Sequence, residues 1–261
     1  MFACRAIAGG SLDVISRLSR TVRNIAHVLL PPVCAVCERE LPLADDALVC
    51  GVCWSRLQRL PHPQCQRCGH PGSVTNCHWC AVLPAYVRSA RSVCWVPDGS
   101  AGPIVHAFKY GGWYRIAGEL ARRMSRLAWP DEERSEWSGI VPVPLSASRL
   151  RERGYNQCRL LADALAQQWK IPAYDQFLMR PVATRVQARL TPEERLRNVA
   201  NAFRVSHMPS CLRGSHLVLV DDVITTSATL NACAAALFDS GVRAVSYVTF
   251  GRARSLGDVP T

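Results

Sequence analysis

The chain has 261 residues, of which 49% are hydrophobic, and its formal net charge at pH 7 is +11. That length and apolar content suit one sizeable α/β domain and a small additional module. No apolar run approaches the roughly 20 residues of a membrane-spanning helix, and the first thirty residues lack a secretory signal, so we expect a cytoplasmic location. The charge suits a polyanionic partner, but an arginine-rich composition with only Lys109 and Lys170 as lysines would explain it equally well.

Residues 1–30 carry apolar side chains at helical spacing, including Leu12, Ile15, Leu18 and Val22, with arginines between them. This periodicity predicts an amphipathic basic helix. We expect it to dock on its own domain; the alternative is a helix that binds a membrane surface or a partner protein.

Eight of the 13 cysteines fall within residues 31–84, as four C-x-x-C pairs separated by 12, 11 and 8 residues. The pairs are Cys34/Cys37, Cys50/Cys53, Cys65/Cys68 and Cys77/Cys80. The two thiolates of such a pair can reach one zinc ion at about 2.3 Å, and eight thiolates complete two tetrahedral sites. A closed Cys₄ site has no open position for a substrate. The spacing therefore predicts a double zinc ribbon with structural zinc.

The pairs can combine in two ways. Sequential pairing, first with second and third with fourth, needs shorter loops and is favoured over a cross-braced arrangement. Because four thiolates serve each zinc, we expect His62, His70 and His78 at the surface and not among the ligands. Trp54 and Trp79 are expected to pack beside the cysteine pairs; the alternative is that they stack on nucleic-acid bases.

Residues 85–255 alternate short apolar runs with segments of helical periodicity, a pattern typical of an α/β domain with a parallel sheet and flanking helices. A junction near 82–85 precedes this domain, and 256–261 form a tail. Strands are expected near 139–143, 176–180, 216–221 and 244–250, with an additional strand near 89–96.

The most informative stretch starts with a buried strand at 216–220, which ends in the carboxylates of Asp221 and Asp222. A loop follows and leads into a helix; its residues are Thr225, Thr226, Ser227, Ala228 and Thr229. Backbone N–H groups, the helix dipole and the hydroxyls can hold a phosphate dianion. The carboxylates can accept hydrogen bonds from two ribose hydroxyls, and one of them can reach magnesium through water. We expect a sugar-phosphate site at the carboxyl end of the sheet.

Two other segments carry candidate phosphate contacts. Arg149 and Arg153 precede Gly154, and arginines beside a glycine suit a pyrophosphate because they offer paired donors and close backbone approach. Taken alone, this segment also reads as a solvated start of a helix. Lys109 is expected either to reach a phosphate or to lie on the surface.

Three strings of residues resemble the ComF family of bacterial proteins. They are Phe108-Lys-Tyr-Gly-Gly112, the string from Val141 to Gln157 that ends in Gly-Tyr-Asn-Gln, and Gln187-Ala-Arg-Leu190 with Arg195, Asn198 and Phe203. Together with the cysteine pairs and the Asp-Asp loop, the resemblance covers about residues 31–254. The chain departs from most relatives at Ser227, where they have glycine.

The resemblance implies a type I phosphoribosyltransferase domain that binds phosphoribosyl pyrophosphate (PRPP) with magnesium. It assigns 141–153 to the pyrophosphate loop and 184–195 to a flap that closes over PRPP. The family, which includes ComFC and GntX, is tied to DNA uptake in natural transformation and to the use of DNA as a nutrient, so other DNA-uptake proteins are expected partners. The acceptor of the phosphoribosyl group stays open. The alternative is a non-catalytic protein that senses PRPP or holds single-stranded DNA.

Overall fold

The structure is a computed structural model, which describes residues 32–42, 47–72, 77–130, 132–181 and 202–254, apart from the side chain of His78. The helix predicted within 1–30, the flap predicted at 184–195 and the tail at 256–261 lie outside these residues. Among the residues described, no helix combines the length and the apolarity that crossing a membrane requires.

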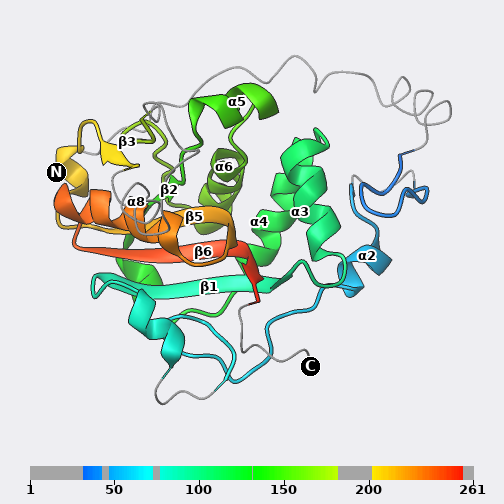
Figure 1. Ribbon diagram of the computed structural model, residues 1–261, viewed down its shortest axis with the longest axis horizontal. Coiled ribbons are helices and arrows are strands. Elements are labelled where there is room, and N and C mark those ends of the chain that lie inside the picture. Colours follow the sequence, from blue (N-terminus) through cyan, green and yellow to red (C-terminus); the bar gives the residue numbers. More distant parts are fainter. Residues whose placement is uncertain (1–31, 43–46, 73–76, 131, 182–201, 255–261) are drawn as a thin grey trace, which may run out of the picture.

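Four parallel strands form the central sheet, in the order β1-β6-β5-β2 (Figure 1). Their bounds are Val87–Val96 (β1), Trp137–Pro142 (β2), His216–Ile224 (β5) and Ala244–Ala253 (β6). The inner strands β5 and β6 are buried along nearly their whole length, as expected of parallel strands covered on both faces. The predicted parallel α/β sheet is confirmed, and the additional strand near 89–96 is a full member at its edge.

Three helices cover one face of the sheet: α3 (Ala101–Tyr110), α4 (Ala117–Met124) and α6 (Gln157–Trp169). A short 3₁₀ turn, η2 (Tyr114–Ile116), joins α3 to α4. Alternate strand residues such as Val218, Val220, Val248 and Phe250 belong to the hydrophobic core on this side. The period-two alternation of a strand therefore divides β5 and β6 between two separate cores.

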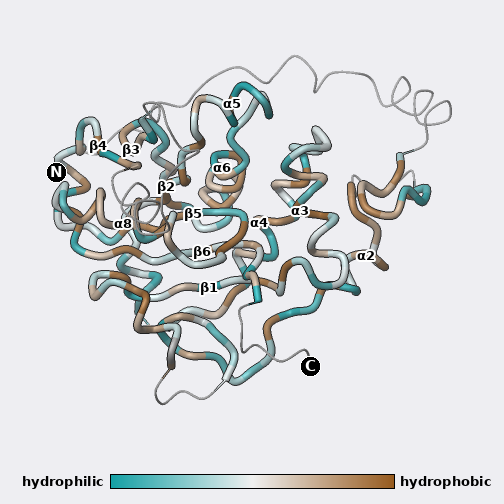
Figure 2. The backbone as a smooth tube through the Cα atoms, viewed as in Figure 1, coloured by the Kyte–Doolittle hydropathy of each residue, from teal (hydrophilic) through white to brown (hydrophobic). Residues whose placement is uncertain are grey.

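The opposite face is covered by α8 (Ala228–Asp239), which packs on the other set of strand residues, including Leu217, Leu219 and Tyr247. Helix α5 (Ala147–Arg153) has no buried residue and is largely hydrophilic (Figure 2). Helix α5 therefore has no apolar face packed on the core; its ends are capped by Ser146 and Gly154.

The two cysteine ribbons lie against the sheet, one in each core. The first, with the short helix α2 (Gly51–Ser55), contributes Cys34, Val49 and Cys53 to the core beneath α3 and α4. The second, with the 3₁₀ turn η1 (His78–Val82), contributes Cys65 and Cys68 to the core beneath α8. The ribbons thus contribute to different cores, and the chain between them pairs with the free edge of β1, through Arg59 with Cys94.

The strand predicted at 176–180 does not belong to the central sheet, which corrects that expectation. β3 (Leu178–Met179) pairs instead with β4 (Arg204–Val205) in a separate antiparallel ribbon. Next to β2, only Ala173 makes a parallel bridge, to Ile140. Pro172 has no N–H group to donate, so this pairing does not extend to residues before Ala173. On the other side, residues 178–179 pair with β4 instead.

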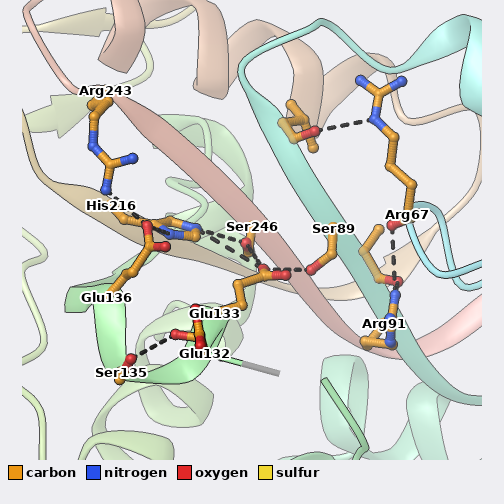
Figure 3. Close-up of polar contacts among 12 residues, drawn as sticks. Arg67, Ser89, Arg91, Glu132, Glu133, Ser135, Glu136, His216, Arg243 and Ser246 are labelled. Atoms are coloured by element: carbon orange, nitrogen blue, oxygen red, sulfur yellow. Dashed lines mark hydrogen bonds and ion pairs between the residues drawn. The ribbon is translucent and has the colours of Figure 1, made fainter. Parts of the chain in front are cut away.

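A buried polar cluster lies where β5 and β6 begin, at the 3₁₀ turn η3 (Glu133–Glu136) (Figure 3). Another 3₁₀ turn, η4 (Ser210–Leu212), precedes β5. The hydroxyls of Ser89 and Ser246 both donate to Oε1 of Glu133. The ring of His216 is fully buried, and its Nε2 lies 2.8 Å from the Ser246 hydroxyl. Burial lowers the pKa of His216. These groups connect three strands at the end opposite to the carboxyl ends. Nδ1 of His216 has no hydrogen-bond partner among the described residues and lies 3.6 Å from Oε2 of Glu136.

Candidate functional site

The candidate site lies at the carboxyl end of β5, where the chain leaves the sheet and enters α8. The apolar run of β5 is buried up to Val220, and the alanine-rich sequence of α8 favours a helix. Between them is a small hollow lined by Asp221, Val223, Ile224, Thr225, Ser227, Ala228, Thr229 and Leu230. Five of the seven residues predicted for this loop line the hollow, whereas Asp222 and Thr226 do not.

Ser227 has a left-handed backbone conformation, with φ of 63° and ψ of −3°. This conformation favours glycine, which is the residue that the resemblance leads one to expect here. The serine therefore keeps the backbone shape of the loop at a conformational cost. No side chain among the described residues caps the N-terminus of α8, so its first N–H groups are open to a ligand.

The two carboxylates of the site have different surroundings. Asp222 is 4% exposed; its Oδ1 lies 2.8 Å from Nζ of Lys109, and its Oδ2 accepts a hydrogen bond from Gln157 at 2.9 Å. Asp221 faces the hollow, and its Oδ1 accepts from the backbone N–H of Asp222 and from the thiol of Cys158 at 3.2 Å. Asp221 is thus the carboxylate that a ligand in the hollow would meet.

Burial, followed by the neighbouring charge of Asp222, raises the pKa of Asp221 to about 7. Burial and the same two carboxylates raise the pKa of the Cys158 thiol well above its ordinary value. The thiol therefore stays protonated and acts as a hydrogen-bond donor to Asp221.

The string Gly-Tyr-Asn-Gln, which the sequence could only match to relatives, has a separate structural role for each residue. Gly154 ends α5 with a left-handed φ of 76°. The hydroxyl of Tyr155 donates to the carbonyl of Phe108, and Asn156 caps α6 through the N–H of Cys158. Gln157 then reaches Asp222. The string connects α5, α3 and α6 to the acidic pair.

The string Phe108-Lys-Tyr-Gly-Gly112 ends α3 beside the same pair. Phe108 is fully buried and anchors the helix end. The guanidinium of Arg153 lies over the ring of Tyr110 at 4.7 Å, and its Nη2 donates to the Tyr110 hydroxyl. Nε and Nη1 of Arg153 are buried and have no hydrogen-bond partner among the described residues. Arg153 therefore has two donors without a hydrogen-bond partner beside the ring of Tyr110.

Arg149 differs from Arg153, because it is exposed near the start of α5, where the hydroxyl of Ser146 accepts from its backbone N–H. Its side chain makes no ion pair among the described residues. A pyrophosphate contact by Arg149 or Arg153, and a phosphate contact by Lys109, stay predictions.

Arg180 is a candidate that the sequence reasoning missed. It follows β3, and its guanidinium lies 5.2 Å from the ring centroid of Phe203. Burial, and next the charge of Arg149, lower its pKa, whereas Asp221 is near enough to raise it. A third arginine therefore approaches the site from the β3–β4 ribbon. No motif could have indicated it, since its neighbours in space come from α5 and β5.

The eight predicted cysteines form two groups of four, which are Cys34, Cys37, Cys50 and Cys53, and Cys65, Cys68, Cys77 and Cys80. This confirms sequential pairing and excludes the cross-braced arrangement. In a regular tetrahedron with zinc–sulfur bonds of about 2.3 Å the sulfurs are about 3.8 Å apart. The measured sulfur pairs are 3.7 and 3.8 Å apart in the first group, and 3.3 and 3.4 Å apart in the second. Both groups fit a zinc ion.

The aromatic and histidine neighbours of the ribbons mostly agree with prediction. Trp54 packs beside the first group and donates to Glu119 at 2.8 Å. Trp79 stacks on His70 with ring centroids 5.2 Å apart. His62 is exposed, as predicted, whereas His70 is half-buried because it also contacts the ring of Trp95. Neither histidine belongs to a group of metal-ligating side chains.

Comparison with known proteins gives matches over most of the chain. A model of the double zinc ribbon domain matches residues 25–94. The DNA utilization protein YhgH of Escherichia coli K12 is 33% identical, over 83% of this chain and 95% of its own length. Competence protein F of Haemophilus influenzae is 30% identical, over 84% and 96%. Competence protein ComFC of Bacillus subtilis is 26% identical, over 85% and 95%. A hypoxanthine phosphoribosyl transferase of Trypanosoma cruzi covers 59% of this chain and 71% of its own, at 18% identity and a TM-score of 0.33.

Proposed function

Because the chain belongs to the ComF family, we propose that it is a phosphoribosyltransferase-like protein that binds PRPP with magnesium in the hollow at the end of β5. The observation that carries this proposal is the shared hollow. One carboxylate, a loop of hydroxyl groups and the uncapped start of a helix all line the same small volume. A sugar phosphate needs these three features together.

The ligand would lie with its 5-phosphate on the loop and its ribose at the carboxylate. The N–H groups at the start of α8 and the hydroxyls of Thr225 and Thr229 would hold the phosphate. Asp221 would accept hydrogen bonds from the ribose hydroxyls. The pyrophosphate would extend toward the free donors of Arg153 and toward Arg149, where paired guanidinium N–H groups suit its oxygens. Magnesium would neutralise part of the pyrophosphate charge.

In phosphoribosyl transfer the protein does not need to form a covalent bond with the substrate. The bond between C1 of the ribose and the pyrophosphate weakens as positive charge develops on the ring, and positioned charges lower the barrier. We therefore expect the residues to act by orientation and electrostatics. Pyrophosphate release from PRPP, screened with a panel of bases and with DNA, would identify the acceptor. PRPP binding without pyrophosphate release, whichever acceptor is offered, would indicate the alternative function, a sensor or a single-stranded DNA scaffold.

We place this activity in DNA uptake or the use of DNA. The relatives' names, DNA utilization protein and competence protein, support that assignment, and the net charge of +11 is compatible with a nucleic-acid partner. We infer a location inside the cytoplasm, where PRPP is available as a ligand.

Calorimetry with PRPP and magnesium tests the binding proposal. Wild-type protein should bind, and Asp221→Asn should bind about tenfold or more weakly, since hydrogen bonds to a charged carboxylate are lost. Asp239→Asn, at the exposed end of α8, is the matched control and should bind like wild type. Absence of binding to the wild type, or equal affinity in Asp221→Asn, would contradict the proposal.

A further inference from the structure

The two aspartates at the end of β5, Asp221 and Asp222, differ in whether they can contact a ligand. Both side-chain oxygens of Asp222 are already occupied, Oδ1 by Lys109 at 2.8 Å and Oδ2 by Gln157 at 2.9 Å. Asp222 is 4% exposed and does not line the hollow. Asp221 does line it, and the contacts made by its side chain involve Oδ1. The second oxygen of Asp221 is thus the acceptor available to a ligand.

Lys109 is held in place for this contact from its own helix. It lies in the last turn of α3, next to the fully buried Phe108, and its side chain is only 21% exposed. The carbonyl of Phe108 also accepts a hydrogen bond from the hydroxyl of Tyr155, which ties the end of α3 to the turn between α5 and α6. Lys109 therefore reaches Asp222 from a fixed backbone.

The charges around the pair show why a cation is needed. Two adjacent carboxylates in a buried position repel each other, and one of them takes up a proton unless a cation compensates. Lys109 contacts Asp222 directly, while Arg180 is a more distant cation on the side of Asp221. The other titratable groups near Asp221 are buried thiols, those of Cys158 and Cys233. Within the described residues, Lys109 is the cation that forms an ion pair with this cluster.

We propose that Lys109 is a positioning residue: it compensates the charge of Asp222 and holds that side chain against Gln157, so that Asp221 alone presents its carboxylate to the ribose hydroxyls. This inference rests on the proposed PRPP site and deepens it. It assigns Lys109 an action through Asp222, in place of the direct phosphate contact expected from the sequence. The two aspartates then have unequal roles, one as ligand and one as support.

The test compares the PRPP affinity of a variant that lacks the Lys109 charge with that of a double variant that also lacks the Asp222 charge. Calorimetry with magnesium measures both affinities. Lys109→Met should weaken binding by about tenfold or more, the effect of leaving a buried carboxylate uncompensated. Adding Asp222→Asn to it should recover most of the affinity, because the amide needs no cation and can keep its hydrogen bond to Gln157. Lys109→Arg should also bind more tightly than Lys109→Met. Lys170→Met changes the chain's other lysine, which is exposed at the end of α6, and should bind like wild type.

The outcomes separate this inference from the proposed function. If the wild type binds no PRPP, the site itself is wrong and the role of Lys109 falls with it. If the wild type binds but Lys109→Met with Asp222→Asn is as weak as Lys109→Met alone, Lys109 contacts the ligand directly and the positioning role is overturned. Thermal unfolding of each variant checks that it is folded. Should the double variant not fold, Asp221→Asn and Asp222→Asn are compared singly: a larger loss in Asp221→Asn supports the unequal roles, and equal losses overturn them.

Discussion

At the scale of single residues, Ser227 shows how the loop can depart from the family and still keep its shape. Its φ of 63° lies in the left-handed region, which costs a non-glycine residue about 1 kcal/mol or more. Glycine would remove that cost but would make the unfolded chain more flexible. The two effects oppose each other, so the serine is tolerated.

We predict that Ser227→Gly raises the free energy of unfolding by about 0.5 kcal/mol and that Ser227→Val lowers it by about 1 kcal/mol or more, because a β-branched side chain is disfavoured at positive φ. Urea unfolding monitored by circular dichroism measures both. A stabilising valine would mean that the loop has a different backbone conformation.

The pKa of Asp221 predicts a dependence of stability on pH. Its folded pKa of about 7 lies above the ordinary value of about 3.9 in an unfolded chain. The folded state therefore binds more protons between about pH 4 and 7, and the associated stability is lost as pH rises through 7. From pH 6 to pH 8 this group should lower the free energy of unfolding by about 1 kcal/mol.

Urea unfolding at the two pH values, with Asp221→Asn as the matched variant, isolates this contribution. The wild type should lose about 1 kcal/mol more than the variant over that interval. If the two proteins change equally, Asp221 does not titrate near pH 7.

At the scale of elements, Glu119 on α4 connects the first ribbon to the domain. Its two carboxylate oxygens accept from the backbone N–H of Leu48 at 2.7 Å and from the indole of Trp54 at 2.8 Å. The guanidinium of Arg123, one turn later, lies 3.2 Å from the centre of the Trp54 ring. A ribbon and a helix distant in sequence are thus joined by one side chain with both oxygens in use.

We predict that Glu119→Ala lowers the free energy of unfolding by about 2 kcal/mol, because two partly buried donors lose their acceptor, and that it accelerates zinc release from the first ribbon. A chromogenic chelator follows the release, and Glu152→Ala on the exposed α5 serves as control. Unchanged stability and unchanged release would show that the ribbon does not depend on this contact.

Much of this architecture could be predicted from the sequence. The four C-x-x-C pairs predicted the zinc ribbons, and residues 216–229 predicted a strand, a loop and a helix. Both predictions depend only on the spacing and type of residues that are close together in the sequence. The antiparallel pairing at 178–179 could not be predicted, because it depends on a partner at 204–205. The contacts of Lys109, Gln157 and Cys158 with the acidic pair also arise only when α3 and α6 pack beside β5.

At the scale of the whole molecule, the ribbons act as parts of the domain's two cores. Cys34 and Cys53 belong to one, and Cys65 and Cys68 to the other. In addition, Arg252 on β6 donates to the carbonyl of Cys68. Loss of metal from either ribbon should therefore lower the stability of the whole domain, including the sheet.

We predict two zinc ions per chain by elemental analysis of reduced protein. Cys34→Ser or Cys65→Ser should bind one zinc and should destabilise the whole domain, since zinc binding to such ribbons supplies folding free energy. Differential scanning calorimetry would show the lower unfolding temperature of the sheet itself. Fewer than one zinc in the wild type, or an unchanged transition in both variants, would contradict this account.

The central claim is that PRPP binds in the hollow between β5 and α8. A crystal structure of the full chain with PRPP and magnesium tests it most directly. We predict a phosphate within hydrogen-bond distance of the N–H groups of the 225–229 loop, ribose hydroxyls at Asp221, and Asp222 still paired with Lys109. A phosphoribosyl group bound elsewhere, or a loop without density for ligand at saturating PRPP, would contradict it.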